Sequence, residues 1–404
     1  MVGTYFPLAF CDEGYVSLKK LFLLATMWFI SLPLALFAGE EFFRNFIQTD
    51  EREILERMSI EEKVGQIFIF GFTGTSLGIE YHSWIEAGRL GNVKIFSRNV
   101  QSRQQVRLLT DSMIALASGS SHGIPPFIAT DLEGGRVNHV RFPGMPSILS
   151  ASKMEGVLQC AETARVITVI LQEMGINMNF APCADVLTNQ KNSVIGSRSY
   201  GENPEFVFEM VRVFVLEQVR VGILPTVKHF PGHGMTDFDS HFEAQSVHTS
   251  VRELKRVHLL PYRRLIRKRL LQSVMVSHVT YDAIDPENPA TFSNAIVERL
   301  LRRKMRFRGI IVTDDLEMES SEMHAGGIEQ AFIRAFEAGN DLFLVAHSKK
   351  KQTLLLQRVP ELFQNGALSE EELDRRVLRI LRMKKRTLSR FYSFLQRHSL
   401  LSEQ

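Results

Sequence analysis

Short runs of apolar residues alternate along the chain with longer segments whose apolar residues recur at helical spacing. Eight of these runs are too short for helices and are bounded by glycine or polar residues, so we predict that they are buried β-strands. They cover residues 66–71, 93–96, 126–130, 177–182, 223–227, 273–277, 309–313 and 341–345. The runs are continuously apolar, which is typical of strands that other elements cover on both faces.

The segments between the runs predict helices. Beginning with a helix from residue 50, they cover 102–117, 152–174, 204–221, 250–270, 293–304 and 327–338, and two more close the chain. Ser59 and Glu62 form a capping-box pattern at a helix start. Eight strands alternating with helices predict an α/β fold, a single (β/α)8 TIM-like barrel with extra C-terminal helices. A doubly wound open sheet would give a similar pattern, and the count of eight favours the barrel.

The N-terminal segment has a different pattern. Two lysines precede an uncharged apolar run over residues 21–38, and two glutamates follow it. This order is typical of a secretory signal or a signal anchor, so we expect an exported protein, periplasmic or attached to the membrane through residues 21–38. An apolar N-terminal helix packed on the domain is the alternative. We assign residues 1–49 to this segment and its linker, 50–386 to the barrel and 387–404 to a C-terminal helical tail.

Composition narrows the class of protein. The chain has 404 residues, of which 45% are hydrophobic and 23% charged, as in ordinary globular proteins. A formal net charge of +3 is too small to argue for nucleic-acid binding. The three cysteines match no metal or disulfide motif, and we expect Cys160 and Cys183 to be buried thiols. We expect a monomer without a second domain.

Most of the predicted strands end in polar residues. These residues are Arg98, Asp131, Asp185, Lys228, His229, His278 and Asp314. The carboxyl ends of the strands of a barrel form one face, so these scattered positions are expected to meet in one pocket. This convergence is the main argument from the residues for an enzyme.

The stretch from Val227 to His241 holds three His, two Asp and a Lys. Pro231 and Gly232 exclude a regular helix, which removes the helical spacing that would bring the histidines of this stretch onto one metal ion. We therefore predict no metal site, and we expect no cofactor.

Acid–base chemistry is a second reading of the same stretch. Asp239 and His241 are two residues apart and would lie on one side of an extended segment. A carboxylate that accepts from one ring nitrogen orients the imidazole and makes it a better base. A loop histidine held by its neighbour is the structural alternative.

Two adjacent carboxylates follow the seventh predicted strand. Asp314 at a strand end could attack an electrophilic sugar carbon, and Asp315 could be structural. Alternatively, one of the two caps the next helix. Asp131, Arg136 and Arg198 could grip hydroxyl groups or an acidic substituent, or could form ordinary ion pairs.

Taken together, these residues resemble a known family. Lys228–Gly234 followed by Asp239-Ser240-His241 is similar to the signature of glycoside hydrolase family 3, in the bacterial β-N-acetylglucosaminidase branch that recycles cell-wall muropeptides. Supporting motifs occur in the same order: Asp131-x-Glu133-Gly134-Gly135-Arg136-Val137, Asn179-Phe180-Ala181-Pro182 with Asp185-Val186, Ile195-Gly196-x-Arg198-Ser199-Tyr200-Gly201 and Thr313-Asp314-Asp315-Leu316-x-Met318. The resemblance runs from about residue 59 to about residue 344.

The resemblance implies a retaining exo-β-N-acetylglucosaminidase that acts on peptidoglycan fragments. Asp314 would be the nucleophile that forms a glycosyl-enzyme intermediate, His241 the acid/base and Asp239 its partner. This dyad would replace the second carboxylate of most glycosidases. The residues that would hold the N-acetylglucosamine ring are Asp131, Arg198, Lys228 and His229.

The chain departs from the family pattern at three positions. Leu132 stands where the family often has Gln, and Met235 stands where many members have Asp. His139 occupies a position that is commonly Arg, with Arg141 two residues later. His139 therefore joins the candidate sugar-binding residues. A family 3 β-glucosidase, a glycoside phosphorylase and a non-catalytic muropeptide-binding protein remain as alternative functions.

Overall fold

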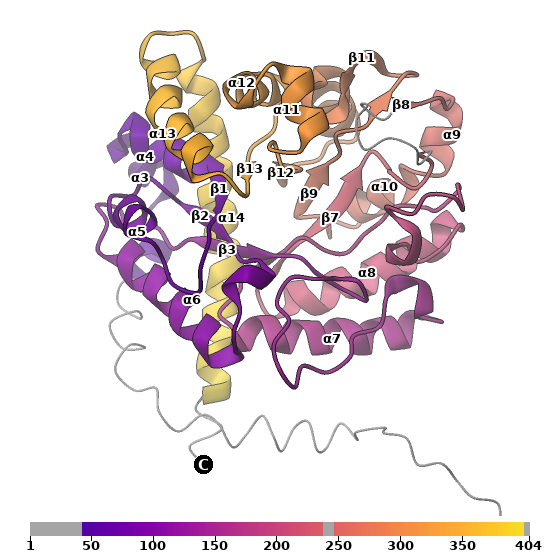
Figure 1. The fold of residues 1–404 in the computed structure, drawn as a ribbon, viewed down its shortest axis with the longest axis horizontal. Helices are drawn as coiled ribbons and strands as arrows, with labels where there is room; N and C mark the ends of the chain where they lie inside the picture. The colour runs from indigo at the N-terminus through magenta and orange to yellow at the C-terminus, as the bar shows by residue number, and fades with distance from the viewer. Residues whose placement is uncertain (1–42, 237–245, 400–404) are drawn as a thin grey trace, which may run out of the picture.

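Eight parallel strands form the centre of the molecule in the computed structural model, which describes residues 43–236 and 246–399 (Figure 1). They are β1 (Phe68–Gly71), β2 (Asn92–Lys94), β3 (Phe127–Thr130), β6 (Met178–Asn179), β7 (Leu224–Phe230), β9 (Ser273–Val276), β12 (Ile310–Thr313) and β13 (Phe343–Val345). The order in the sheet is β12-β9-β7-β6-β3-β2-β1-β13. A parallel bridge between Val312 and Leu342 joins the two outer strands, so the sheet closes on itself. The predicted barrel and its eight strands are confirmed.

Helices surround this barrel (Figure 1). They are α3 (Glu51–Arg57), α4 (Ile60–Ile67), α5 (Ile79–Glu86), α6 (Arg103–Ser118), α7 (Val157–Glu173), α8 (Pro204–Arg220), α10 (Leu260–Arg267), the π-helix η5 (Ala295–Lys304), α12 (Ile328–Ala338), α13 (Lys349–Gln364) and α14 (Glu370–Ser399). The capping box predicted at Ser59 is present, with reciprocal hydrogen bonds between Ser59 and Glu62 at the start of α4.

Two helical segments differ from the expectation. The helix expected over 250–270 is divided into α9 (Val251–Arg256) and α10. Pro261 lies in the first turn of α10, where its missing N–H has no intrahelical partner to lose, whereas inside one long helix it would break the hydrogen-bond ladder. At the other end of the chain, α14 is continuous across residue 386, where the boundary of the tail was placed.

Aromatic side chains fill much of the space between the barrel and its helices. Phe332 of α12 contacts Phe68 of β1 and Phe343 of β13, with ring centroids 5.2 and 4.8 Å apart. All three rings are fully buried. Cys160 and Cys183 are buried free thiols, as expected.

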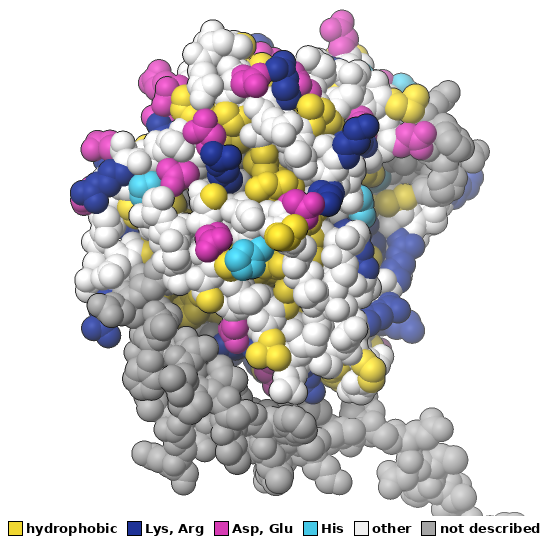
Figure 2. Space-filling model, turned by 60° about the vertical axis from the view of Figure 1, so that its left-hand side comes forward, with side chains coloured by type: hydrophobic (Ala, Val, Ile, Leu, Met, Phe, Trp, Pro, Cys, Tyr) yellow, Lys and Arg dark blue, Asp and Glu magenta, His cyan; other side chains and the backbone are white. Residues whose placement is uncertain are grey.

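The surface is mixed in charge. On the face in Figure 2, Lys and Arg side chains are interspersed with Asp and Glu, and neither sign forms a continuous patch. Among the described residues, no helix combines the length and apolar composition that crossing a membrane requires. The apolar run over residues 21–38, for which we predicted export or anchoring, lies outside the described residues.

Candidate functional site

Five charged side chains meet at the carboxyl ends of the strands, and we call them the charged cluster: Lys94, Asp131, Glu133, Arg198 and Lys228. Lys94 ends β2, Asp131 directly follows β3, and Lys228 belongs to β7. The two carboxylate oxygens of Asp131 lie 2.6 Å from the ammonium groups of Lys94 and Lys228 respectively. Three strands of the barrel, β2, β3 and β7, therefore bring one carboxylate between two lysines.

Glu133 connects the rest of the charged cluster. It lies in the short strand β4 (Leu132–Gly134), which forms a hairpin with β5 (Val137–Asn138) just beyond β3. Its carboxylate accepts two hydrogen bonds from the Arg198 guanidinium, at 2.9 and 2.8 Å, and lies 2.7 Å from Lys228 Nζ. Arg198 comes from the 3-10 helix η3 (Gly196–Arg198). The bidentate geometry fixes the guanidinium in both position and plane.

The charges in the cluster stabilise one another. Burial raises the pKa of Asp131, but the nearby Lys228 and Lys94 outweigh it and hold this pKa well below its ordinary value. Burial likewise opposes ionisation of Glu133, while Lys228 and Arg198 lower its pKa to about 2. The pKa of Lys228 is raised to about 12, because Asp131 and Glu133 outweigh the cost of burial. Asp131, Glu133 and Lys228 are thus ionised at neutral pH.

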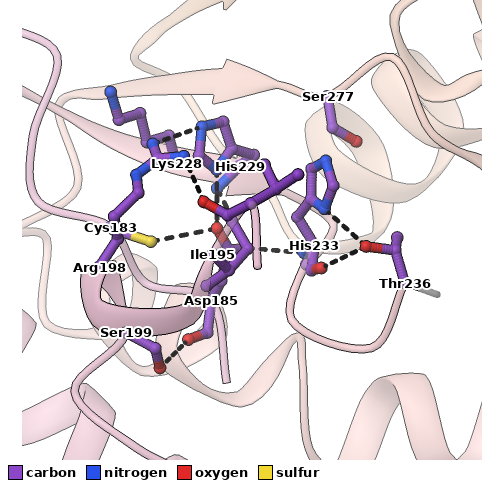
Figure 3. Close-up of polar contacts among 12 residues, drawn as sticks. Cys183, Asp185, Ile195, Arg198, Ser199, Lys228, His229, His233, Thr236 and Ser277 are labelled. Carbon is purple, nitrogen blue, oxygen red and sulfur yellow. Dashed lines mark hydrogen bonds and ion pairs between the residues drawn. The ribbon is translucent and has the colours of Figure 1, made fainter. Parts of the chain in front are cut away.

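His229, next to Lys228, is held by a buried carboxylate (Figure 3). Its Nδ1 lies 2.7 Å from Asp185, which is fully buried, and its Nε2 lies 3.2 Å from the Arg198 guanidinium. Because a guanidinium can only donate, Nε2 accepts and the ring proton is on Nδ1, where it is donated to Asp185. Asp185 therefore orients His229 rather than facing the site itself.

Lys228 and His229 lie within β7, which we had predicted to end at Val227. The register of β7 against β9 is irregular between Val227 and Phe230. Such an irregularity re-aims side chains that would otherwise alternate strictly between the two faces of a strand. It allows two consecutive residues to reach Asp131 and Asp185 respectively.

Cys183, Asp185 and His229 are the one group of three neighbouring metal-ligand types in the described ranges, with their ligand atoms within 4.8 Å of one another. Each atom already has a partner. Asp185 accepts from the main-chain N–H of His233 at 2.6 Å and from the Cys183 thiol at 3.2 Å. Burial, with Asp185 adding to it, raises the pKa of the Cys183 thiol well above its ordinary value, whereas a metal requires the thiolate. The group fits a hydrogen-bond network better than a metal site.

The loop that follows β7 is anchored at its base (Figure 3). The Asn192 side chain donates to the His233 carbonyl and to the Thr236 hydroxyl, both at 2.8 Å. Gly234 lies so close to the Val186 carbonyl that a Cβ would come within 2.0 Å of its oxygen. These contacts fix residues 231–236, the approach to the predicted acid/base dyad. Asp239 and His241 themselves lie outside the described residues.

Asp314 follows β12 and lies within electrostatic reach of the residues described above. Its own burial raises its pKa, but attraction from His278 and Lys228 outweighs this and lowers the pKa below its ordinary value. Asp314 as a residue is half-buried, and its carboxylate accepts a hydrogen bond from the Asp315 N–H at 2.9 Å. It is therefore ionised.

Asp315 has structural partners. Its carboxylate accepts from the main-chain N–H groups of Glu317 and Ala346, at 3.1 and 3.2 Å. The next helix, α11 (Glu319–Ala325), has Met318 as its N-cap residue, so neither aspartate caps it. Of the two readings considered for this pair, the structure favours a structural Asp315 beside a half-buried Asp314.

Three other predicted residues lie at the rim. His139 Nδ1 is 3.3 Å from Asp131, so His139 borders the charged cluster. Arg136 donates to the carbonyls of Ser193 and Val194 and holds a loop. Arg98 donates to the carbonyls of Phe72 and Ala346, both at 2.7 Å, and ties the loop after β1 to the end of β13. Arg136 and Arg98 thus have structural partners.

Comparison with known proteins decides the family. Residues 59–383 match the model described as the glycosyl hydrolase family 3 N terminal domain. The chain belongs to glycoside hydrolase family 3.

Three similar proteins are named beta-hexosaminidase or beta-N-acetylglucosaminidase. The chain is 31% identical to the beta-hexosaminidase A of Pseudoalteromonas piscicida, over 77% of this chain and 56% of that protein. It is 32% identical to a beta-hexosaminidase of Idiomarina loihiensis, over 75% and 94%. A family 3 beta-N-acetylglucosaminidase from Paenibacillus sp. has a similar structure, with a TM-score of 0.77 and 35% identity over 82% of this chain and 63% of that one. The chain spans less than two thirds of the first and third of these proteins.

Two members of the charged cluster, Lys94 and Glu133, were not predicted as site residues from the sequence. Lys94 was read as part of an apolar strand, and Glu133 as part of a motif without a role. The signal for Lys94 is a lone cation inside a run that is otherwise apolar, because a buried lysine needs a partner. Glu133 is two residues from Asp131 and could have been read as a second carboxylate at the same strand end.

Proposed function

We propose that this chain is a retaining exo-β-N-acetylglucosaminidase. Asp131, Lys228, Arg198 and His229 would hold the hydroxyl groups of a terminal sugar, with His139 at the edge of the same site. Asp314 would be the nucleophile, and His241 with Asp239 would supply and remove the proton. The observation that carries the proposal is the meeting of the charged cluster and an ionised Asp314 at the carboxyl end of one barrel.

The chemistry follows from these positions. The Asp314 carboxylate attacks the anomeric carbon while His241 protonates the departing glycosidic oxygen, so the bond to the aglycone breaks as the glycosyl–aspartate bond forms. The neutralised His241 then takes a proton from water, which attacks the same carbon and releases Asp314. Two displacements return the sugar with its original configuration.

The cluster suits sugar recognition because it is both polar and rigid. Its carboxylates accept from hydroxyl groups, and its ammonium and guanidinium groups donate to hydroxyl oxygens. Mutual ion pairs hold these groups in place before a ligand arrives, which reduces the entropy cost of binding. Fragments of peptidoglycan with a terminal β-linked N-acetylglucosamine are the substrates that we infer for this site.

The test compares two chromogenic substrates. Purified protein is incubated with 4-nitrophenyl N-acetyl-β-glucosaminide and with 4-nitrophenyl β-glucoside, with and without inorganic phosphate. We expect faster release of nitrophenol from the N-acetyl substrate and no dependence on phosphate. Equal or faster turnover of the glucoside would contradict the N-acetyl specificity, and a rate that requires phosphate would identify a phosphorylase.

Export is a separate part of the proposal. The basic flank, the apolar run over residues 21–38 and the acidic exit support a periplasmic or membrane-anchored protein, which we expect to be monomeric. Fractionation of cells that express the full chain tests this: the protein is expected in the periplasmic or membrane fraction. Recovery with cytoplasmic markers would contradict it.

A further inference from the structure

Two turns at the amino end of the barrel hold an arginine where similar turns hold glycine. The residue after the C-cap is Gly88 for α5, Gly175 for α7 and Gly222 for α8, with positive φ angles of 69°, 69° and 84°. After α10 and η5 the same position is Arg269 and Arg306, with φ angles of 57° and 59°. A side chain in this conformation costs free energy that glycine avoids. Such a strained residue is a reason to look for a function.

The two arginines occupy equivalent places in neighbouring units of the barrel. Each stands four residues before the first residue of its strand, and these first residues, Ser273 of β9 and Ile310 of β12, are partners in the sheet. A cation near the end of a helix favours the helix dipole, but Arg267 and Lys304 already stand in the last turns of α10 and η5. The helix dipole therefore does not explain a further arginine in the strained position.

Helix α14 lies across the same end of the barrel. Lys384 Nζ donates to the carbonyl of Gly91, just before β2, at 2.8 Å. The main-chain nitrogen of Phe391 lies so close to Gly222, just before β7, that a Cβ on this glycine would come within 2.1 Å of it. One face of α14 thus covers the amino ends of the strands, and its other face is turned outward.

Six exposed cations belong to these turns and to the outer face of α14, and we call them the basic face: Lys268, Arg269, Arg306, Arg308, Arg386 and Arg390. Within residues 43–236 and 246–399, none of the six side chains forms an ion pair or a hydrogen bond. The connections that carry the first four, residues 267–272 and 303–309, contain no Asp or Glu. The basic face therefore presents charge that no neighbour neutralises, as a surface for an anionic partner does.

The described chain begins beside the basic face. The ring of Phe43 packs on the ring of Tyr392, two residues after Arg390 in α14, with centroids 4.3 Å apart. Only residues 39–42 separate Phe43 from the apolar run over residues 21–38. Even a fully extended chain would place the end of that run within about 18 Å of Phe43. A membrane segment at 21–38 would therefore hold the amino end of the barrel next to the bilayer.

We propose that the basic face binds the headgroups of anionic phospholipids and seats the barrel on the membrane by its amino end. The inference rests on the membrane attachment proposed above. Basic residues beside a membrane segment are attracted to the negative surface of a bilayer, and each one adds to the binding. The charged cluster and Asp314, at the opposite end of the barrel, then face away from the bilayer, so the site receives its sugars from solution.

Hydrogen exchange of the full chain with vesicles tests this inference. One set of vesicles is phosphatidylcholine, and the other contains about one third phosphatidylglycerol. We expect the amides of residues 267–272 and 303–309 to exchange at least about fivefold more slowly with the anionic vesicles, because one cation at such a surface already contributes about this factor. The difference should disappear at high salt, which screens exposed charges.

The matched variant is the double substitution Arg269→Gly and Arg306→Gly. Glycine removes two charges and also the strain, so the melting temperature should not fall, whereas the difference between the two vesicles should be lost. Lys153→Gln removes an exposed cation from the connection between β5 and α7, at the carboxyl end, and should leave the difference unchanged. Equal exchange with both vesicles, or a difference that the double variant keeps, overturns the inference.

Two further results separate this inference from others. Retention of the chain by the neutral vesicles tests the membrane attachment alone: a chain that only anionic vesicles bind and protect keeps the basic face and loses the anchor. A short DNA duplex that releases the protected residues from anionic vesicles at physiological salt would overturn the lipid assignment in favour of a nucleic acid. Turnover of the chromogenic substrate depends on none of these outcomes.

Discussion

The two ends of the barrel both bury charged side chains, but Lys228 at one end and Arg376 at the other differ in their partners. At the carboxyl ends of the strands, Lys228 pairs with the carboxylates of Asp131 and Glu133. At the amino ends, Arg376 of α14 donates to the main-chain carbonyls of Phe336 and Asn340, both at 2.8 Å. The amino ends also hold ion pairs, such as Asp341 between Arg302 and Arg379, but Arg376 there joins α14 to main-chain carbonyls as well.

This difference separates recognition from stability. A cation that satisfies main-chain carbonyls joins elements of the fold and leaves nothing for a ligand. Cations and carboxylates that hold one another at a strand end form a rigid set of donors and acceptors beside the partly accessible Asp314. Barrel enzymes use the carboxyl ends of their strands for chemistry and the amino ends for stability. The following substitutions test whether this division holds here.

Asp314→Asn is expected to have the largest effect. The amide keeps the size of the side chain but cannot attack the sugar, so kcat should fall about ten-thousandfold or more, as for other enzymes that lose their nucleophile. The free energy of unfolding should change by less than about 1 kcal/mol, because Asp314 has no ion-pair partner among the described residues. Activity within tenfold of wild type would refute the assignment.

Arg376→Met tests the other end. The variant keeps roughly the length of the side chain but removes the guanidinium from the Asn340 carbonyl, from the Phe336 carbonyl, which keeps only the Gly339 N–H, and from Glu372, which should cost about 4 kcal/mol in the free energy of unfolding. Urea unfolding measures this cost. The folded variant should keep its kcat/KM on the chromogenic substrate, and a loss of activity without a loss of stability would contradict the division between the two ends.

Acid should destabilise the carboxyl end. The pKa of Glu133 falls from 4.5 to about 2 on folding, so its stabilising contribution is complete above its unfolded pKa and is lost as pH falls from about 5 to about 2. The loss from this group is roughly 3 kcal/mol. Urea unfolding measures the free energy of unfolding between pH 6 and pH 2.5. This free energy should fall more steeply with decreasing pH for wild type than for Glu133→Gln, and the exposed Glu56→Gln is the control that should match wild type. Equal slopes in all three would count against the buried cluster.

Lys384 should give the smallest effect, and it too should make stability rise with pH, but in the alkaline range. This fully buried lysine of α14 donates to the Gly91 carbonyl and the Gln66 side chain, and burial lowers its pKa well below its ordinary value. The unfolded chain binds this proton more tightly, so its contribution to stability rises with pH up to about 10.4, by at most about 1.4 kcal/mol per pH unit. Between pH 7 and pH 9, the free energy of unfolding should increase less for Lys384→Met than for wild type, whereas the exposed Lys268→Met should match wild type. An equal increase of the free energy of unfolding in Lys384→Met and wild type would contradict a lowered pKa for Lys384.

The same two ends explain how much could be predicted from the sequence. The eight strands were predictable because each lies in a short, mostly apolar run, and Asp131 and Asp314 were predictable because they follow such runs directly. The pairing of Asp131 with Lys228 depends on barrel closure, because the two are 97 residues apart in sequence. Lys94 escaped prediction for the same reason: its partner comes from another strand.

The pattern of apolar residues also could not predict features that depend on contacts between residues distant in the sequence. The hairpin of β4 and β5 has no periodic pattern, because glycine positions and close main-chain approaches build it. The Asp239–His241 dyad stays a prediction, since both residues lie outside the described ranges. Arg136 could not be separated from Arg198 by sequence alone, since the difference lies in their partners, a set of carbonyls for one and Glu133 for the other.

Trapping of the covalent intermediate tests the central claim most directly. A fluorinated N-acetylglucosaminyl donor with a good leaving group should form the glycosyl-enzyme faster than water removes it. After proteolysis, mass spectrometry should find one added sugar on the peptide that contains Asp314, and Asp314→Asn should show no adduct. A sugar attached to any other carboxylate, or unlabelled protein that still turns the donor over, would contradict the account.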